Sequence, residues 1–341
     1  MIAVTSGHES GFSVLELLVA ILLALVVVSA SVEFVNPNAS ISRRHAAGIE
    51  LQQRLRFGAD SLFRALYIAG AGLDSGPQSG ALANYFATIL PRRIGLRNPD
   101  GDRVARADAV TIIHVADTRA QAVLDQDFAA LDAVVSDQPG CSLAQPVCGI
   151  QVGLGVLLFD RSGHFDAFTA SHVYPDRVAL RHRAPARPYP YPAGALVAEG
   201  ETRTYYFDAA AHQLRQYDGD DTDAPVLDDV TAFRVEYFGD PSPPLAPKPP
   251  LGEANCLYDA SGALVAGLPS LAPTDEGLAR LDLRMLSDGP WCGDGATLFD
   301  ADLLRVRRVR VTLEAFVPDT SANSRRYGAS FDVTPRNLGL K

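Results

Sequence analysis

The sequence has 341 residues, of which 47% are hydrophobic and 21% are charged, with 28 glycines and 23 prolines. This composition excludes a purely disordered chain and a disulfide miniprotein, and it indicates a loop-rich globular protein of one large or two modest domains. The formal net charge of −10 argues against nucleic acid as the main partner, because the chain offers no overall basic surface to a phosphate backbone.

The first predicted element is an apolar helix close to the N-terminus. Leu17–Val28 is twelve apolar residues long, and all 30 lysines and arginines follow Ser42. As a helix, the segment 14–35 spans about 33 Å, close to the roughly 30 Å of a bilayer core. We considered a secretory signal cleaved at 29–31, a plain membrane anchor and a buried soluble helix. A secretory signal would need a basic start, which is missing here. A plain anchor leaves the costly intramembrane Glu16 unexplained, and the length of the apolar run disfavours a buried soluble helix.

The residues that open this run resemble a known processing signal. The stretch Gly11-Phe12-Ser13-Val14-Leu15-Glu16 and the apolar residues after it are similar to the class III signal of type IV pilins and type II secretion pseudopilins. The resemblance implies that a prepilin peptidase cuts after Gly11 and that Phe12 becomes the N-methylated first residue. It also implies that Glu16 pairs with the Phe12 amine of a neighbouring subunit, since two charges that are each costly in lipid are tolerable as a pair.

The next predicted element is an amphipathic helix over 37–70. We expect Pro37 to kink or interrupt the chain before it, and Gly70 and Gly72 to end it. The residues that define its apolar stripe recur at spacings of three and four: Leu51, Leu55, Ala59, Leu62, Leu66 and Ala69. The segment 51–70 resembles the second half of the long helix in PilW-type minor pilins and pseudopilin J, although such a stripe is usually a helix packed on a sheet.

After Gly72 the sequence predicts short strands separated by turns. The expected strands are 109–115, a hairpin of 154–159 and 165–173, a second pair of 203–207 and 213–217, 231–238, and an alternating strand around 308–315. The segment 240–250 holds six prolines and is expected to be a loop within one head. The segments 302–307 and 335–338 also resemble the end of PilW-type chains.

These elements predict an α+β fold, in which a long N-terminal helix with a transmembrane half and an amphipathic half packs on an antiparallel β-sheet head with loop-rich insertions. We divide the chain into a leader (1–11), a transmembrane and filament-core helix (12–36), an amphipathic helix (37–70) and a periplasmic β-rich head (71–341).

The four cysteines all follow the apolar segment, where disulfides persist if that side is the periplasm. Three pairings are open, and we favour Cys141 with Cys148 and Cys256 with Cys292, because local loops close most easily. Zinc is the competing interpretation. It is disfavoured because the sequence has no Cys-x-x-Cys motif and its histidines are scattered.

Two further groups of residues were weighed as binding sites. The cluster 218–223 holds Asp218, Asp220, Asp221 and Asp223, as a calcium loop would, but it lacks the helices of an EF-hand and favours a solvated hairpin turn. Trp291 and the pair Tyr189 and Tyr191 are candidates to line a carbohydrate or peptide groove, or to pack a surface loop. No cofactor is expected.

No recognised catalytic motif occurs in the sequence, so we expect no enzyme.

The predicted function is a minor pilin or pseudopilin of the initiating or tip complex, because so large a head is poorly suited to tight repetition in a shaft. The implied partners are the prepilin peptidase, other minor and major pilins or pseudopilins, and the inner-membrane assembly platform. The implied location is the bacterial inner membrane with the head in the periplasm, and afterwards a type IV pilus or type II secretion pseudopilus. A single-pass anchored periplasmic binding protein is the alternative, followed by an anchored enzyme.

Overall fold

The computed structural model describes residues 13–73, 80–115, 120–128, 131–137, 146–265, 267–293, 298–317 and 326–338, with the backbone alone at 34–44, 136, 137, 146 and 148. The chain forms two compact units, Met1–Gln52 and Gln53–Lys341, which we call the N-terminal unit and the head. The expected α+β class is confirmed at the level of one long N-terminal helix and antiparallel sheets with few other helices.

Helix α1 (Val14–Ile68) begins in the N-terminal unit and ends in the head. The predicted interruption at Pro37 is wrong, because the helix passes through this residue. A proline removes one backbone hydrogen bond at a cost of about 3 kcal/mol, and the intact turns on both sides keep the helix continuous. The helix stops where expected, since Gly70 adopts a φ of 75°.

Ten strands of the head form one antiparallel sheet, and part of this sheet closes into a barrel. The first residues of β8 (Leu196–Asp208) pair with β3 on one side and β5 on the other, which completes the ring. The remaining ring members, in spatial order from β8, are β3 (Gln121–Leu124), β4 (Asp132–Asp137), β7 (Arg177–His182), β6 (Phe165–Val173) and β5 (Gly155–Phe159). Closure leaves none of these six described strands at a free edge.

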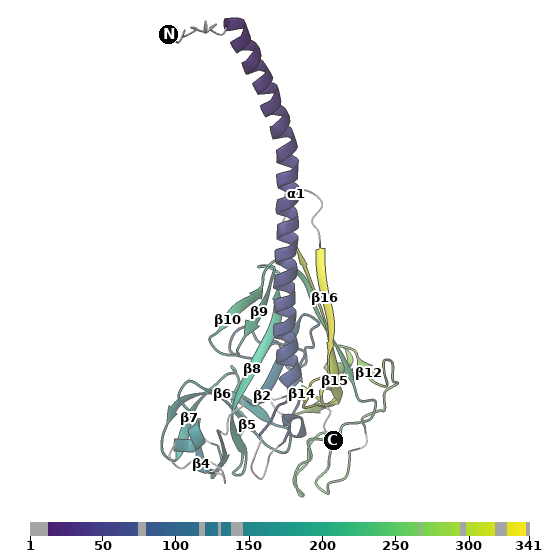
Figure 1. Cartoon of the computed structure of the whole chain (residues 1–341). Helices are drawn as coiled ribbons and strands as arrows, with labels where there is room; N and C mark the ends of the chain where they lie inside the picture. The colour runs from purple at the N-terminus through teal and green to yellow at the C-terminus, as the bar shows by residue number, and fades with distance from the viewer. Residues whose placement is uncertain are drawn as a thin grey trace, which may run out of the picture. The chain divides into compact units, whose positions relative to one another are not determined.

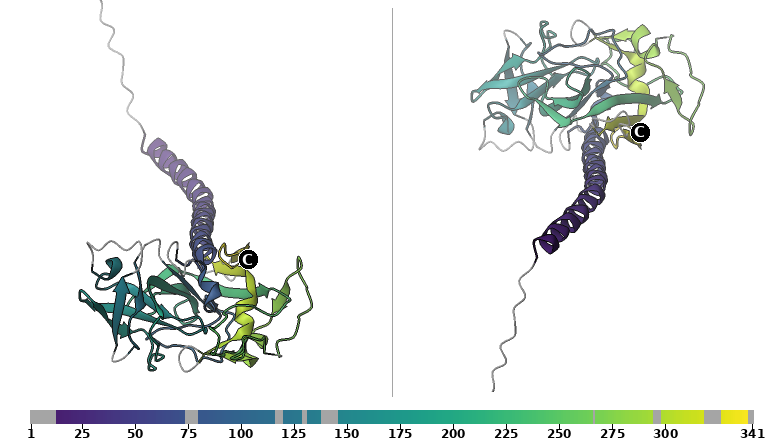
Figure 2. Two further views of the ribbon diagram at one scale, coloured as in Figure 1. Left: turned by 90° about the horizontal axis from the view of Figure 1, so that it is seen from below. Right: turned by 90° about the horizontal axis from the view of Figure 1, so that it is seen from above.

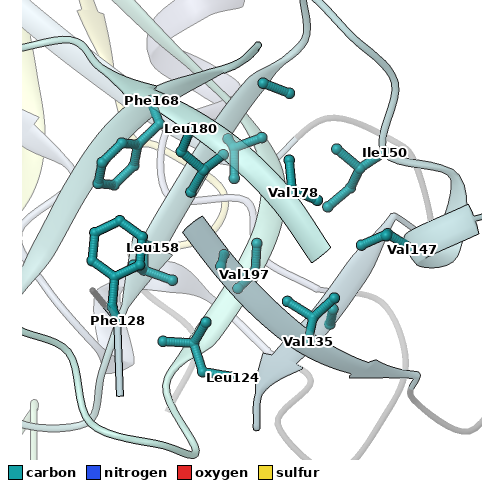
Figure 3. Close-up of a cluster of buried hydrophobic side chains, with 14 of the residues drawn as sticks. Leu124, Phe128, Val135, Val147, Ile150, Leu158, Phe168, Val178, Leu180 and Val197 are labelled. Carbon is teal, nitrogen blue, oxygen red and sulfur yellow. The ribbon is translucent and has the colours of Figure 1, made fainter. Parts of the chain in front are cut away.

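The barrel encloses a hydrophobic core of its own (Figure 3). Its large side chains come from every strand of the ring, from the short helix η2 (Pro146–Gly149), and from Phe128 and Ile150 in the loops after β3 and η2. They include Leu124, Phe128, Val135, Val147, Ile150, Leu158, Phe168, Val178, Leu180 and Val197. The sequence predicted the hairpin of β5 and β6 but not the closed barrel.

The second half of β8 leaves the barrel and continues into an open part of the sheet. There it pairs with β2 (Ala109–Val115) and β9 (Gln213–Tyr217), which confirms two of the predicted strand regions. The open part ends in two edge strands, β1 (Ile89–Leu90) and β10 (Asp223–Leu227).

A separate four-stranded antiparallel sheet has the order β12 (Ala279–Leu281), β11 (Val230–Gly239), β15 (Val306–Phe316) and β16 (Arg326–Val333). The predicted alternation in β15 is confirmed, since Val309, Val311 and Leu313 are fully buried. Figures 1 and 2 show this sheet on one side of the last turns of α1 and the barrel strands on the other. Leu55, Leu62 and Leu66 of the predicted helix stripe are buried.

The small remaining elements cap or connect the sheets. They are η1 (Leu82–Asn84), α2 (Met285–Asp288), the paired strands β13 (Trp291–Cys292) and β14 (Phe299–Asp300), and η4 (Ala301–Arg305). The proline-rich segment 240–250 is a loop, as predicted. It leads into an insertion between β11 and β12 that contains little regular structure.

The residues that follow β16 form hydrogen bonds with the C-terminal end of α1. The backbone N–H of Arg336 donates to the carbonyl oxygen of Tyr67 at 3.0 Å, and the side-chain amide of Asn337 lies 3.4 Å from the carbonyl oxygens of Ile68 and Ala69. These carbonyl groups have no partner within the helix. The segment after β16 therefore caps α1 from outside its own sequence neighbourhood.

Candidate anchoring segment and polar sites of the head

The first part of α1 is long and apolar enough to cross a membrane. The stretch Val14–Glu33 has 20 residues and none of its apolar window is buried in the structure. Its large apolar side chains are exposed by 49% at Ile21 to 75% at Val14. A helix of this length spans about 30 Å, the thickness of a bilayer core. This segment is the candidate anchoring site of the chain.

The N-terminus of this helix carries a capping box formed by Ser13 and Glu16. The Ser13 hydroxyl accepts the backbone N–H of Glu16 at 3.2 Å, and a carboxylate oxygen of Glu16 accepts the backbone N–H of Ser13 at 3.1 Å. The same oxygen also accepts the Ser13 hydroxyl at 3.3 Å. This reciprocal arrangement satisfies two donors that helix geometry leaves without partners. The predicted processing residues Gly11 and Phe12 lie outside the described residues.

The structure contains the disulfide predicted between Cys256 and Cys292. Their Cα atoms lie 5.2 Å apart, and the bond joins the insertion before β12 to β13. It closes a loop with a sequence separation of 36 residues. Cys141 and the side chain of Cys148 lie outside the described residues, so the second favoured pairing stays a prediction.

The acidic cluster 218–223 forms the turn between β9 and β10, as the hairpin interpretation predicted. The predicted solvation of this turn does not extend to Asp220, which is only 5% exposed. Asp220 accepts two hydrogen bonds from Arg181, at 2.7 and 2.6 Å, and one from Thr169 at 2.6 Å. Burial acts to raise the pKa of Asp220, but these hydrogen bonds and the positive charge of Arg181 and Arg183 outweigh it and lower the pKa.

The other three carboxylates of this cluster point to different partners. Asp218 accepts the backbone N–H groups of Asp220 and Thr222, Asp223 pairs with Arg215 at 2.9 Å, and Asp221 is exposed. In the described part of the chain, no group of three or more His, Cys, Asp or Glu side chains is arranged to hold a metal ion. The calcium interpretation of the cluster therefore loses its geometric basis.

A buried polar group at one end of the barrel was not foreseen from the sequence. One oxygen of Asp166 lies 2.7 Å from His182 Nε2, and the other accepts the Tyr191 hydroxyl and the Tyr189 backbone N–H, both at 3.0 Å. His182 Nδ1 faces the carbonyl oxygen of Ala186 at 2.9 Å. The His182 ring is therefore held between the Asp166 carboxylate and the Ala186 carbonyl oxygen. Isolated Asp and His residues far apart in sequence carry no local signal of such a pair.

The Tyr191 side chain is held in this group as a hydrogen-bond donor. It is fully buried, and burial together with the negative Asp166 raises the pKa of its hydroxyl well above the usual value. The group thus ties the segment 185–191 to the β6–β7 hairpin and orders one wall of the adjacent groove.

That groove has a volume of about 510 Å³. Its walls are Phe128, Leu131, His182 and the segment 185–190, which contains Arg187 and Tyr189. Tyr189 stacks on His164 at a centroid distance of 3.7 Å. Of the aromatic residues weighed from the sequence, Tyr189 lines the groove and Tyr191 is buried beneath it. Trp291 lies elsewhere, stacked with the Arg103 guanidinium at 5.1 Å.

Compared with known proteins, the chain matches no protein-family model, no curated protein and no solved structure.

Proposed function

We propose that this chain is a pilin-like subunit, a minor pilin or pseudopilin, that is cleaved after Gly11 and assembles through the first part of α1. The observation that carries the proposal is the motif from Gly11 to Glu16 placed directly before Val14–Glu33, a helix that is apolar and exposed along its length. An exposed apolar helix of this kind needs either lipid or other helices around it. A pilin-like subunit uses both, first in the membrane and then in the filament.

The Ser13–Glu16 capping box gives Glu16 a role at each stage. Before assembly, the Glu16 carboxylate is satisfied by the backbone and hydroxyl of Ser13, which lowers the cost of holding it at the lipid boundary. After cleavage, the Phe12 ammonium of a neighbouring subunit offers a stronger, oppositely charged partner. Exchange of one partner for the other favours a fixed offset between adjacent helices.

The head supports a location outside the cytoplasm. The Cys256–Cys292 disulfide is stable in an oxidising compartment such as the periplasm. The head, Gln53–Lys341, is bulky for a repeating shaft subunit, so we place the chain in the initiating or tip complex of a type IV pilus or type II secretion pseudopilus. Its partners in this proposal are the prepilin peptidase, other pilin-type subunits and the inner-membrane assembly platform.

Intact-mass and N-terminal peptide mass spectrometry tests the processing step. The full chain is expressed with and without a prepilin peptidase, and we expect a mature chain that starts at methylated Phe12 only with the enzyme. A Gly11→Val variant should stay uncleaved, and a Ser13→Ala variant serves as the matched neighbour. A chain that keeps Met1–Gly11 under both conditions contradicts the proposal, and a start near Ser31 indicates ordinary secretion.

Two matched carboxylate variants test the assembly step. Glu16 and Glu33 lie at the two ends of the apolar segment, so Glu16→Ala and Glu33→Ala remove the same charge at opposite ends. We expect both variants to be cleaved and membrane-bound, and only Glu16→Ala to fail to co-purify with filaments. Equal incorporation of the two variants would contradict the assigned role of Glu16.

A second function, that of a single-pass anchored binding protein, is favoured by the groove beside Tyr189. Its volume of about 510 Å³ falls in the usual range of small-molecule sites, and its walls are mainly aromatic residues and prolines. In that case Glu16→Ala is tolerated, and changes in the groove such as Tyr189→Ala or Arg187→Ala remove the function instead. The two functions are thus separated by which set of variants matters.

A further inference from the structure

The outer edge of β16 is an open strand edge. β16 is the last strand of the four-stranded sheet and pairs only with β15, from Val309↔Val333 to Phe316↔Arg326. Among the described residues, no other backbone group forms a hydrogen bond with residues 326–333. A strand of eight residues therefore presents a row of unpaired N–H and C=O groups.

This edge differs from the other strand edges of the head. β1 has two residues and β12 has three, and β10 contains Pro225 together with a register shift before Leu227. Short length, proline and bulges are the usual means by which sheet edges avoid unwanted pairing. β16 has none of them, because it is long, proline-free and in continuous register with β15, with charges only at Arg326 and Asp332. Among the described edges, that of β16 is therefore the one without these protections.

The register shows which groups are free. The backbone N–H of Phe316 donates to Asp229 at 3.0 Å, so at this residue the β15 backbone points away from β16. Because the direction of N–H groups alternates along a strand, Ala315 and Leu313 point toward β16, where they face Tyr327 and Ala329. The N–H groups of the intervening residues Gly328, Ser330 and Asp332 then point to the open edge.

An incoming strand would also cover aromatic surface. Phe331 of β16 lies beside Phe63 of α1, with ring centroids 6.3 Å apart, and Phe63 stacks on Tyr67 at 6.1 Å. Phe63 and Tyr67 are 40% and 43% exposed, so part of each ring is open to a partner. A strand added at β16 places every second side chain on the α1 face of the sheet, where these two rings offer apolar contact.

The direction of β16 selects the kind of strand that fits. Phe331 contacts Phe63 and Arg336 bonds to Tyr67, so β16 and the last turns of α1 run in the same direction (Figure 1). Two copies paired edge to edge through β16 by a two-fold axis are antiparallel, and the ends of their α1 helices then point in opposite directions. Under the proposed function, the last turns of α1 run in one direction in all subunits of a membrane. A neighbouring subunit therefore has to supply a strand that runs in the direction opposite to the neighbour's own N-terminal helix. In this head, β12 and β15 run opposite to α1 in this way.

We propose that the β16 edge binds an antiparallel strand from a neighbouring pilin-type subunit that is anchored in the same membrane, so that the sheet continues from one subunit into the next. This inference rests on the proposed function. The strand carries apolar side chains at alternate positions, which pack on Phe63 and Tyr67. It carries a carboxylate opposite Arg326, an exposed guanidinium that forms no ion pair with the described residues.

Amide hydrogen exchange tests the pairing directly. The full chain is compared in detergent micelles and in filaments assembled by co-expression with the prepilin peptidase and the pilin-type subunits of the host, with residue-level mass spectrometry of 326–333. We expect exchange at Gly328, Ser330 and Asp332 to slow by about tenfold or more on assembly. Ala329 and Phe331 should be protected in both states because they bond to β15.

Two variants at one position separate the backbone from the side chain. Ser330→Ala and Ser330→Pro both remove the hydroxyl that lies 3.2 Å from the Thr312 hydroxyl, but only the proline removes the edge N–H. We expect Ser330→Pro to be cleaved and folded, and to lower the ratio of filament-bound to membrane-bound chain about tenfold. Ser330→Ala should behave as the wild type. Ala329→Pro removes a ladder N–H instead, and it should lower the melting temperature of the chain before assembly.

The outcomes are distinguishable. Incorporated chain with unchanged exchange at the three edge amides overturns strand addition and leaves the proposed function intact. Cleaved wild-type chain that never enters filaments overturns the proposed function and this inference together. Edge amides that are already slow in a micellar dimer assign the edge to a second copy of the chain, which overturns the assignment to a neighbour of the same membrane.

Discussion

Arg305 and Asp302 form an ion pair in the interior of the head, with the Nε–Oδ1 distance at 2.6 Å and the Arg305 side chain fully buried. The same guanidinium donates to the carbonyl oxygens of Pro241 at 3.1 Å and Pro269 at 2.8 Å. Pro241 lies at the start of the insertion between β11 and β12, and Pro269 lies in its last third. One buried side chain therefore binds two distant points of an otherwise irregular segment next to the start of β15.

Replacement of Arg305 by methionine should destabilise the head strongly. Methionine fills most of the volume but leaves the Asp302 carboxylate buried without its cation, a change that typically costs about 3–5 kcal/mol. Chemical denaturation of the full chain in detergent measures the loss. Arg280→Met is the control, because Arg280 is half exposed and its pair with Glu236 is worth about 1 kcal/mol or less. Equal losses for the two variants would contradict the role assigned to Arg305.

The Cys256–Cys292 disulfide should provide a second, independent restraint on the same insertion. A cross-link that closes a loop of this length contributes about 2–4 kcal/mol, mainly through the unfolded chain. We expect the double variant Cys256→Ser/Cys292→Ser to lose this amount, and reduction of the wild type to have the same effect. Non-reducing peptide mapping of the wild type identifies the pair. Recovery of Cys256 joined to Cys141 or Cys148 would contradict the assignment.

Asp300 should make the stability of the head fall as the pH rises from about 4 to 6. Its side chain accepts hydrogen bonds from Asp302 and Gly289, and burial raises its pKa to about 6 from the ordinary value of 3.8. In this window the folded state binds the proton more tightly than the unfolded state, so stability is highest below it. The contribution lost across the window is at most about 3 kcal/mol.

The measurement is the free energy of unfolding of the wild type and Asp300→Asn across this pH range. His114 acts in the opposite direction, since burial lowers its pKa and its contribution is lost as the pH falls below 6.5. The slope of the free energy of unfolding against pH is therefore compared between the wild type and Asp300→Asn, because the wild-type slope contains both contributions. The control Asp221→Asn, at an exposed carboxylate, should keep the wild-type slope. An unchanged slope in Asp300→Asn would refute the prediction.

Local sequence patterns predicted the parts of the fold that depend on neighbours in the chain. The strand over 109–115 and the hairpin of 154–159 and 165–173 follow from alternation and turn residues, and the structure has them with nearly the same bounds. The pairing of Cys256 with Cys292 followed from ease of loop closure. The break at Pro37 failed because a single proline does not end a long helix.

The barrel and its buried polar group were beyond this kind of reasoning. Closure depends on β8 pairing with β3 and β5 at the same residues, a relation between distant segments that no local pattern encodes. Asp166 and His182 lie on neighbouring strands of that barrel, and Tyr191 reaches them from the segment that follows. Asp220 was misjudged for the same reason, because Arg181 and Thr169 come from the barrel and bury a carboxylate that its own neighbours leave exposed.

Calcium should not stabilise the head, because protein side chains already bind Asp220, the most buried carboxylate of the acidic turn. Asp220 is bound by Arg181 and Thr169, and its contribution to stability is present above pH 3.8 and lost as the pH falls, since its folded-state pKa is lowered. We expect no rise in melting temperature at about 5 mM calcium relative to magnesium, above the range of weak extracellular sites. Asp220→Asn should cost about 2 kcal/mol through its charged hydrogen bonds, and Asp221→Asn should cost little. A calcium-specific rise in melting temperature that is lost in Asp220→Asn would show that the ion pair between Arg181 and Asp220 opens to admit the ion.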